Sequence, residues 1–174
     1  MSRSVPFATT LEVRDTCFCL HVQRAARALA RRFDDAFRSI GLTNGQFSLL
    51  MSLNCPEPRA IGPVARLLGM DRTTVTAALK PLSGLVKVSA DPDDRRSRLL
   101  ELTPAGRKVL AAAVPIWRKT HAAVEKELPG IDPDGLRGSL RMLSRSPGEH
   151  SDPPSATEKQ DASSRQRIAQ RSRA

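Results

Sequence analysis

Two short stretches of the sequence hold side chains that could contact a nucleic acid. The first is DPDDRRSR at residues 91–98, which has three aspartates and three arginines in eight positions. The opposite charges cancel by count, so this segment is not a simple basic patch. Asp94 can fix a turn or orient Arg96, which leaves Arg95 or Arg96 at the tip. A guanidinium group at that tip can enter the minor groove of DNA, whose negative potential is strongest where the groove is narrow.

The second stretch is RTTVT at residues 72–76, followed on the same segment by Lys80. An arginine can pair with guanine through two hydrogen bonds, and a threonine can bind a phosphate or touch a thymine methyl group. In the first turns of a helix that lies in the major groove, such side chains face the base edges. The alternative is that the threonines only cap and solvate an exposed helix. The candidates for DNA contact are Arg72, Thr73, Thr74 and Thr76, with Lys80 expected on a phosphate.

A third candidate is the pair Cys17 and His21, one helical turn apart in the segment CFCLH. A protonated imidazole on the same face, together with the amino terminus of the helix, would favour the thiolate form of Cys17. The pair is therefore a candidate redox sensor. The alternative is structural, because a cysteine is often a small buried apolar residue. Cys19 points away from Cys17 on a helix, so a disulfide between them would require unwinding.

The pattern of apolar residues predicts a helix-turn-helix and a hairpin around the DNA-contact candidates. TNGQ at 43–46 has the form of a capping box that starts a helix. Residues 61–69 and 71–82 follow as two short helices joined by a tight turn that contains Gly69. After Gly84 the sequence alternates, turns at DPDD and alternates again through SRLLELT, which predicts two strands. A helix-turn-helix followed directly by a hairpin is a winged helix-turn-helix.

Longer helices flank this module. Apolar residues at three- and four-residue steps predict a helix over 16–40. Thr103 as cap and Pro104 at the first position predict another, bent at Pro115 and ending near Leu128. The apolar stripes of these helices need another surface, and a second copy of the chain is the simplest source. We therefore expect a mainly α fold with a small β-hairpin wing and long terminal dimerisation helices.

These patterns also predict the boundaries of the chain's parts. Asp132 is expected to cap a last short helix, and beyond Ser146 almost nothing is apolar. The expected parts are a flexible arm at 1–15, a folded domain at 16–145 with its DNA-binding lobe at about 43–102, and a disordered polar tail at 146–174.

The composition favours a polyanionic partner. The 174 residues carry 28 Lys and Arg against 18 Asp and Glu, which gives a formal net charge of +10 and an isoelectric point of about 10.7. Nucleic acid is the first candidate and an acidic membrane surface the second. The sequence has no Gly-rich phosphate loop, no metal-binding cluster and no nucleophile with a base at recognisable spacing. We expect no enzyme, no metal and no cofactor.

The sequence also lacks the patterns of membrane insertion and secretion. No apolar run approaches the 18 or so residues of a membrane span, and charges and hydroxyls interrupt the amino terminus where a signal peptide would have its core. Three cysteines are too few for a disulfide framework. The expected location is the cytoplasm, without a membrane partner.

From residue 16 to residue 143 the sequence resembles the MarR family of bacterial transcription regulators. LTNGQFSLLMSL, VARLLGMDRTTVTAALKPL and GLVKVSADPDDRRSRLLELTPAG follow one another in the order typical of that family. The most specific signature is the Asp-x-Arg of the wing, followed by Leu-Thr and Gly where the hairpin enters the next helix. Here these residues are Asp94, Arg96, Leu102, Thr103 and Gly106.

The resemblance implies a homodimer with interleaved terminal helices and two DNA-binding lobes that read a palindromic operator. It also implies a location in the bacterial cytoplasm, in association with the nucleoid. It assigns Arg96 to the minor groove and Arg95 to a phosphate. It also implies an effector, a lipophilic or aromatic small molecule or an oxidant, that changes the separation of the lobes. The expected pocket residues are Phe47, Met51 and Trp117, with His21 as a further possibility.

Two features qualify the resemblance. CFCLH is similar to the reactive-cysteine segment of the organic-hydroperoxide-sensing branch, which relies on nearby tyrosines, whereas this chain has no tyrosine. The junction LSGLV at residues 82–86 is about two residues shorter than the usual family pattern, which is expected to shorten the end of the recognition helix. The leading hypothesis is a sequence-specific, double-stranded DNA-binding repressor. The alternative is a basic module that binds nucleic acid without sequence preference.

Overall fold

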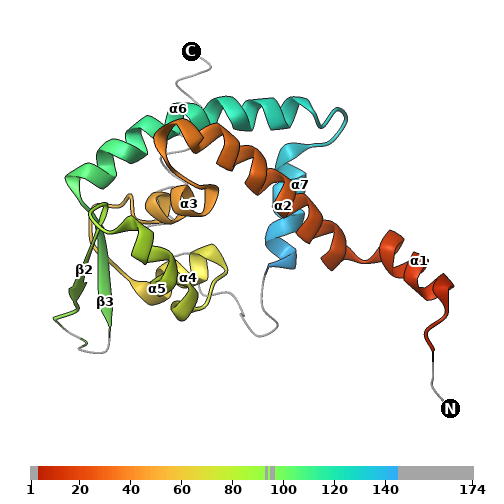
Figure 1. Cartoon of the computed structure of the whole chain (residues 1–174), viewed down its shortest axis with the longest axis horizontal. Coiled ribbons are helices and arrows are strands. Elements are labelled where there is room, and N and C mark those ends of the chain that lie inside the picture. The colour runs from red at the N-terminus through yellow and green to blue at the C-terminus, as the bar shows by residue number, and fades with distance from the viewer. Residues whose placement is uncertain (1–3, 93, 95–96, 145–174) are drawn as a thin grey trace. The chain divides into compact units, whose positions relative to one another are not determined.

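The computed structural model describes residues 4–92, 94 and 97–144 of the chain. It is mainly helical, with one small sheet (Figure 1). The elements run in this order: α1 Phe7–Thr16, α2 Phe18–Phe37, the 3-10 helix η1 Arg38–Ile40, α3 Asn44–Ser52, β1 Arg59–Ala60, α4 Ile61–Leu68, α5 Arg72–Leu79, the 3-10 helix η2 Lys80–Leu82, β2 Val86–Ala90, β3 Arg98–Leu102, α6 Pro104–Lys126 and α7 Pro133–Leu143. The predicted fold class, a winged helix-turn-helix with long flanking helices, is confirmed.

Local capping explains where several of the helices begin and where α4 ends. The Thr43 hydroxyl accepts the Gln46 N–H and the Gln46 side chain accepts the Thr43 N–H, so the predicted capping box of α3 is present. Asp71 caps α5 and Thr103 caps α6. Helix α4 ends at Gly69, whose φ of 63° lies in the left-handed region that favours glycine. These local signals make the helix-turn-helix readable from sequence.

The wing is a three-stranded antiparallel sheet in the order β1-β3-β2. The predicted strands β2 and β3 pair from Val86 opposite Leu102 to Ala90 opposite Arg98. Strand β1 adds a short third strand, with Arg59 opposite Leu100. The sequence did not predict β1, because two residues are too few to show an alternating pattern.

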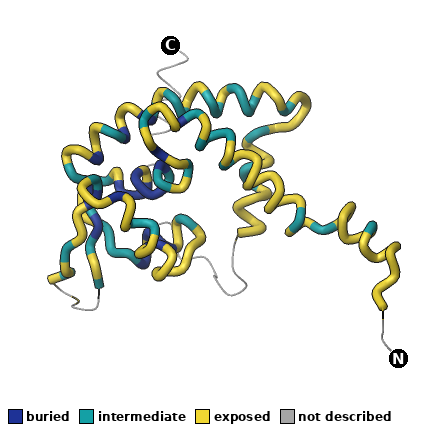
Figure 2. The backbone as a smooth tube through the Cα atoms, viewed as in Figure 1, coloured by how far each residue is buried: buried dark blue, intermediate teal, exposed yellow. Residues whose placement is uncertain are grey.

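A single apolar core joins the helix-turn-helix, the sheet and the long helices. Its residues are almost completely buried, and the dark blue segments of the tube concentrate around α3, α4 and the wing (Figure 2). The largest of them are Phe37, Leu49, Leu50, Leu53, Val64, Val75, Leu82, Leu100 and Leu102. The core thus combines residues from α2, α3, α4, α5, η2 and β3. This shared packing fixes α5 relative to the wing.

The first helices differ from the sequence-based expectation. The flexible arm expected at 1–15 contains α1, and the helix expected over 16–40 begins at Phe18, after an extended Cys17 with φ −73° and ψ 105°. Helix α1 has no buried residue, and its apolar side chains do not concentrate on one side, so helical periodicity does not predict it. Helix α6 runs through Pro115 and ends at Lys126, two residues before the predicted end at Leu128.

Among the described residues, those from Gly130 to Ser144 belong to a separate unit. Its helix α7 begins at Pro133 after Asp132, whose carboxylate accepts the N–H groups of Asp134 and Gly135. The predicted cap at Asp132 is therefore present. The tail expected at 146–174 lies outside the described residues. Among the described residues, no helix is long and apolar enough to cross a membrane.

Candidate nucleic-acid interface

Helix α5 exposes the side chains that the sequence suggested for DNA contact. Its core contact is Val75, which is completely buried, while Arg72, Thr73, Thr74 and Thr76 are all exposed. Lys80 is exposed at the start of η2, where Pro81 ends regular α-helix. In Figure 1, α5 lies beside the hairpin of β2 and β3, as a recognition helix and a wing would. The α5 candidates and Lys80 are therefore all exposed to solvent.

The three threonines of α5 do not play the same part. The Thr74 N–H and hydroxyl both donate to the Asp71 carboxylate at 2.7 Å, and these bonds hold the pKa of Asp71 below its ordinary value. The Thr76 hydroxyl donates to the Arg72 carbonyl oxygen at 2.8 Å. Within the described part of the chain, only the Thr73 hydroxyl of the three makes no hydrogen bond. Thr74 thus caps the helix, as the alternative reading expected, while Thr73 is open to a ligand.

Arg72 does not point straight out from α5. Its guanidinium group lies against Gly62 in the first turn of α4, where a Cβ atom would be 3.2 Å from Nη2. A cleft of about 250 Å³ opens there, between α4 and the wing. Its lining residues are Ala60, Ile61, Gly62, Pro63, Arg66, Arg72, Asp94 and Ser97. Sequence reasoning missed Arg66 and Gly62, although a glycine inside a helix is a signal of close approach.

The wing turn is closed by its own backbone. The Ser97 N–H donates to the Asp94 carbonyl oxygen at 2.8 Å, and the Asp91 N–H donates to the Ser97 carbonyl oxygen at 3.3 Å. The main chain of Asp94 therefore takes part in the turn, one of the two roles considered for this residue. Arg95 and Arg96, the candidates for the wing tip, lie outside the described residues.

Thr103 and Gly106 tie the recognition helix, the wing and α6 together. The Thr103 hydroxyl donates to the Gly84 carbonyl oxygen at 2.7 Å and accepts the Gly106 N–H at 3.1 Å. A Cβ atom on Gly106 would collide with the Leu85 carbonyl oxygen, so only glycine fits. The shortened junction turns at Gly84, whose φ is +88°. The signature residues of the sequence thus set the position of the wing.

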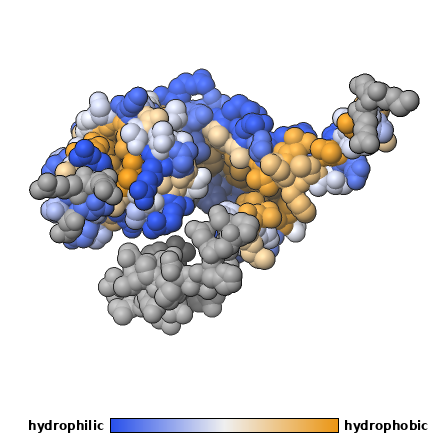
Figure 3. Space-filling view, turned by 90° about the horizontal axis from the view of Figure 1, so that it is seen from below, coloured by the Kyte–Doolittle hydropathy of each residue, from blue (hydrophilic) through white to orange (hydrophobic). Residues whose placement is uncertain are grey.

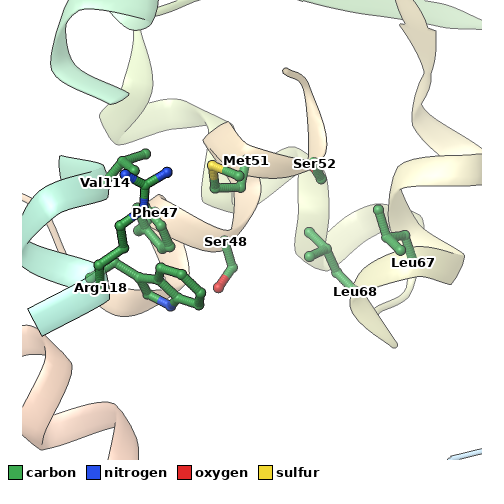
Figure 4. Close-up of a pocket in the computed structure, with 9 residues that line it drawn as sticks. Phe47, Ser48, Met51, Ser52, Leu67, Leu68, Val114 and Arg118 are labelled. Atoms are coloured by element: carbon green, nitrogen blue, oxygen red, sulfur yellow. The ribbon is translucent and has the colours of Figure 1, made fainter. Parts of the chain in front are cut away.

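A second cavity contains the residues suggested for an effector. It has a volume of about 530 Å³ between α3, α4 and α6, and Figure 4 shows most of its wall. Phe47 and Trp117 stack with their ring centroids 6.3 Å apart. The lining residues are Phe47, Ser48, Met51, Ser52, Leu67, Leu68, Val114, Trp117 and Arg118. Phe47, Met51 and Trp117 are thus brought together, whereas His21 is not part of this wall.

Cys17 and His21 lie at the junction of α1 and α2. Cys17 is half-buried at the N-cap of α2, and its side chain makes no capping hydrogen bond. The His21 Nε2 atom is 3.3 Å from the Asp15 carbonyl oxygen, so the imidazole contacts the end of α1. The Cys19 sulfur accepts a hydrogen bond from Gln23 at 3.1 Å. The helix amino terminus, one of the two features expected beside Cys17, is therefore present.

The sequence matches a known protein family and a curated relative. A model of the MarR family matches residues 42–97. The HTH-type transcriptional repressor NicR of Pseudomonas putida is 32% identical over 80 residues, which cover 45% of this chain and 51% of NicR. This chain therefore spans about half the length of that curated relative.

Solved structures match a larger share of the chain. The Mycobacterium tuberculosis transcriptional regulator MosR, in complex with DNA, is 37% identical with a TM-score of 0.67, over 74% of this chain and 93% of MosR. Bordetella bronchiseptica BpsR, whose DNA binding is regulated by 6-hydroxynicotinic acid, is 26% identical with a TM-score of 0.63, over 75% and 95% of the two chains. On this fold and these matches, the chain belongs to the MarR family.

Proposed function

We propose that this protein is a sequence-specific, double-stranded DNA-binding transcription regulator that acts as a repressor. In the proposed complex, α5 with η2 enters the major groove and the wing at 91–98 reaches the adjacent minor groove. Thr73 and Thr76 face the base edges, while Lys80 and Arg95 bind phosphates and Arg96 enters the minor groove.

The observation that carries this proposal is the exposed face of α5 beside the wing. A helix with one buried face and a row of exposed hydroxyl and cationic side chains is the arrangement that reads a major groove. The formal charge of +10 supports a polyanionic partner. The DNA complex of MosR, a relative at 37% identity, supports DNA as that partner.

Two copies of the chain would form the functional unit and read a palindromic operator. The support is an apolar face of α2 that stays partly exposed in the described part of the chain. Phe18 is 76% exposed, Val22 40% and Leu29 42%. The space-filling view shows orange, hydrophobic side chains exposed on the face of the molecule that is seen from below (Figure 3). Such a face is typical of a surface that another subunit buries.

We further propose that an effector in the cavity of about 530 Å³ releases the protein from DNA. Phe47, Met51 and Trp117 suit a flat, lipophilic ligand, and Arg118 is the charged residue of the wall, placed to pair with an acid. The regulation of BpsR by 6-hydroxynicotinic acid supports this class of ligand. Oxidation of Cys17 is the second proposed route to release, with His21 as its neighbour.

Competition binding tests the regulator. A labelled duplex from the DNA flanking the gene is titrated with the protein at fixed salt, against unlabelled copies of the same duplex and of a scrambled one. A regulator prefers its own site by roughly 10³-fold or more. Equal competition by both duplexes would favour the alternative, a basic module without sequence preference.

Peroxide separates the two routes to release. If Cys17 is the sensor, peroxide releases the wild-type protein from the specific duplex and leaves the Cys17→Ser variant bound. Release that persists in Cys17→Ser would exclude Cys17 as the sensor.

A further inference from the structure

The cleft between α4 and the wing is lined by two arginines that have no anionic partner among the described residues. Arg66 extends from α4 and Arg72 from the first position of α5, and both are exposed. Neither guanidinium group makes a hydrogen bond or an ion pair within the residues that the structure describes. Some other arginines of the chain are paired, for example Arg107 with Glu101 and Arg32 with Glu127.

Gly62 explains why Arg72 lies in this cleft. With no side chain on Gly62, the Arg72 guanidinium group packs against the main chain of α4. Its Nη2, Nε and Cζ atoms lie 3.2, 3.6 and 3.7 Å from the position that a Cβ atom of Gly62 would take. A planar cation held flat on a surface keeps its outward N–H groups in a fixed fork, which matches two oxygens of a phosphate. The same packing turns Arg72 toward α4 and the wing.

The charge of the cleft also favours an anion. Two guanidinium groups face one carboxylate, that of Asp94, which has an interaction of its own. No side chain caps the first turn of α4, whose residues Ile61 and Gly62 form part of the same wall. An anion that enters the cleft would therefore meet two cationic side chains.

We infer that Arg66 and Arg72 form a phosphate clamp that holds one phosphate of the DNA backbone between the helix-turn-helix and the wing. Arg72 then contributes affinity and not sequence choice, although its place in RTTVT suggests a base contact. The base-reading side chain at the start of α5 is Thr73, whose hydroxyl is open. This inference rests on the proposed DNA-binding function and assigns one of its contacts.

The salt dependence of binding distinguishes a phosphate contact from a base contact. Dissociation constants are measured over a range of salt concentrations for the duplex from the DNA flanking the gene and for a scrambled duplex. Arg72→Ala and Arg66→Ala are each expected to weaken binding to both duplexes by the same factor. The slope of log K against log salt becomes shallower by about 0.9 for each lost phosphate contact. Arg72→Lys, which keeps the charge, should retain the wild-type slope.

The matched control is Arg107→Ala, which removes the same charge at α6, outside the cleft. It should leave the salt slope within error of wild type. A loss confined to the specific duplex in Arg72→Ala would overturn the inference, because only a base contact carries sequence information. An unchanged slope in Arg72→Ala would overturn it as well.

The same titrations keep the two proposals apart. If the wild-type protein binds both duplexes equally while Arg72→Ala weakens both and flattens the slope, the sequence-specific regulator fails and the clamp stands. If the wild-type protein prefers its own duplex and Arg72→Ala abolishes only that preference, the clamp fails and the regulator stands.

Discussion

At the residue scale, the side chains of α5 divide between holding the helix and facing solvent. Asp71 and Thr74 use their polar groups on each other, and Thr76 bonds back to the main chain. Thr73 is left with an open hydroxyl. A short run of similar threonines thus contains one capping residue, one that bonds its own helix and one that is available to a ligand.

The Asp71 cap should make stability depend on pH. Hydrogen bonds from Thr74 lower the folded-state pKa of Asp71 below its unfolded value of about 3.9. The contribution is therefore fully present above the unfolded pKa and is lost as pH falls through the folded pKa. Asp71→Asn removes this charge, so the difference in melting temperature between wild type and variant should shrink from about pH 6 to about pH 3.

Thr74→Val is the companion variant, because it removes the hydroxyl donor and keeps the N–H donor. With one hydrogen bond fewer to Asp71, the contribution of the Asp71 carboxylate to the melting temperature should depend less on pH. The difference in melting temperature between wild type and Asp71→Asn is the test. If it stays constant from about pH 6 to about pH 3, the charge of Asp71 does not stabilise the cap.

Gly106 should be intolerant of any side chain. A Cβ atom there meets the Leu85 carbonyl oxygen, which belongs to the backbone and cannot move aside cheaply. Gly106→Ala is expected to lower the free energy of unfolding by about 1–3 kcal/mol, as overpacking does. The measurement is urea denaturation, with Gly45→Ala as the control because nothing lies within 4 Å of its Cβ position. Equal effects of the two substitutions would refute the steric argument.

At the element scale, the wing depends on the end of η2 and the start of α6. The main chain of Leu85 accepts the Thr103 N–H at 3.0 Å, so the strand that leads into the wing is bonded to the residue that begins α6. Movement of α6 would therefore be passed to β2 and β3. In the proposed regulation, this coupling connects a ligand in the cavity beside α6 to the position of the wing.

Thr103→Val tests that connection. Valine keeps the shape but loses the hydroxyl that bonds the Gly84 carbonyl and the Gly106 N–H. Stability should fall by about 1 kcal/mol, the typical cost of a lost N-cap, and DNA affinity should fall with it. Thr103→Ser keeps the hydroxyl and should behave like wild type in urea denaturation and in DNA binding. Full affinity in Thr103→Val would show that the wing does not need this bond.

At the scale of the whole molecule, α2 is a helix whose apolar side chains a single chain buries only in part. Its last residue, Phe37, is completely buried, whereas most of its first half is exposed. Phe33 and Phe37 pack with ring centroids 6.1 Å apart, so the apolar stripe begins in the core and continues outward along the helix. A continuous stripe of this kind fits one helix that serves both the lobe and a subunit interface.

Leu29→Asp should separate the subunits without unfolding the lobe. Leu29 is 42% exposed in the single chain, so a charge is tolerated there in the monomer and is buried only on association. Sedimentation should show a monomer, with weaker binding to a palindromic duplex. Ala28→Asp adds the same charge at the neighbouring exposed position and should remain associated. A Leu29→Asp protein that sediments like wild type would exclude this face from the interface.

The sequence by itself determined the elements whose signals are local. Thr43 with Gln46, Asp71, Thr103 and Asp132 mark helix starts because each cap is made within three residues along the chain. The alternating runs around DPDD predicted β2 and β3 for the same reason. Helical periodicity predicted the exposed positions on α5. Val75, Ala78 and Leu79 mark the side of the helix that faces the core, so the other side faces solvent.

Only the tertiary structure decided which distant residues meet. Strand β1 forms because β3 lies beside it and pairs with it. Helix α1 has no apolar face from which a helix could be predicted. The cleft that holds Arg72 depends on Gly62 of the preceding helix, and the cavity beside Trp117 needs three helices. Periodicity reports which face of a helix is buried but not what covers it, because that depends on contacts between segments far apart in the sequence.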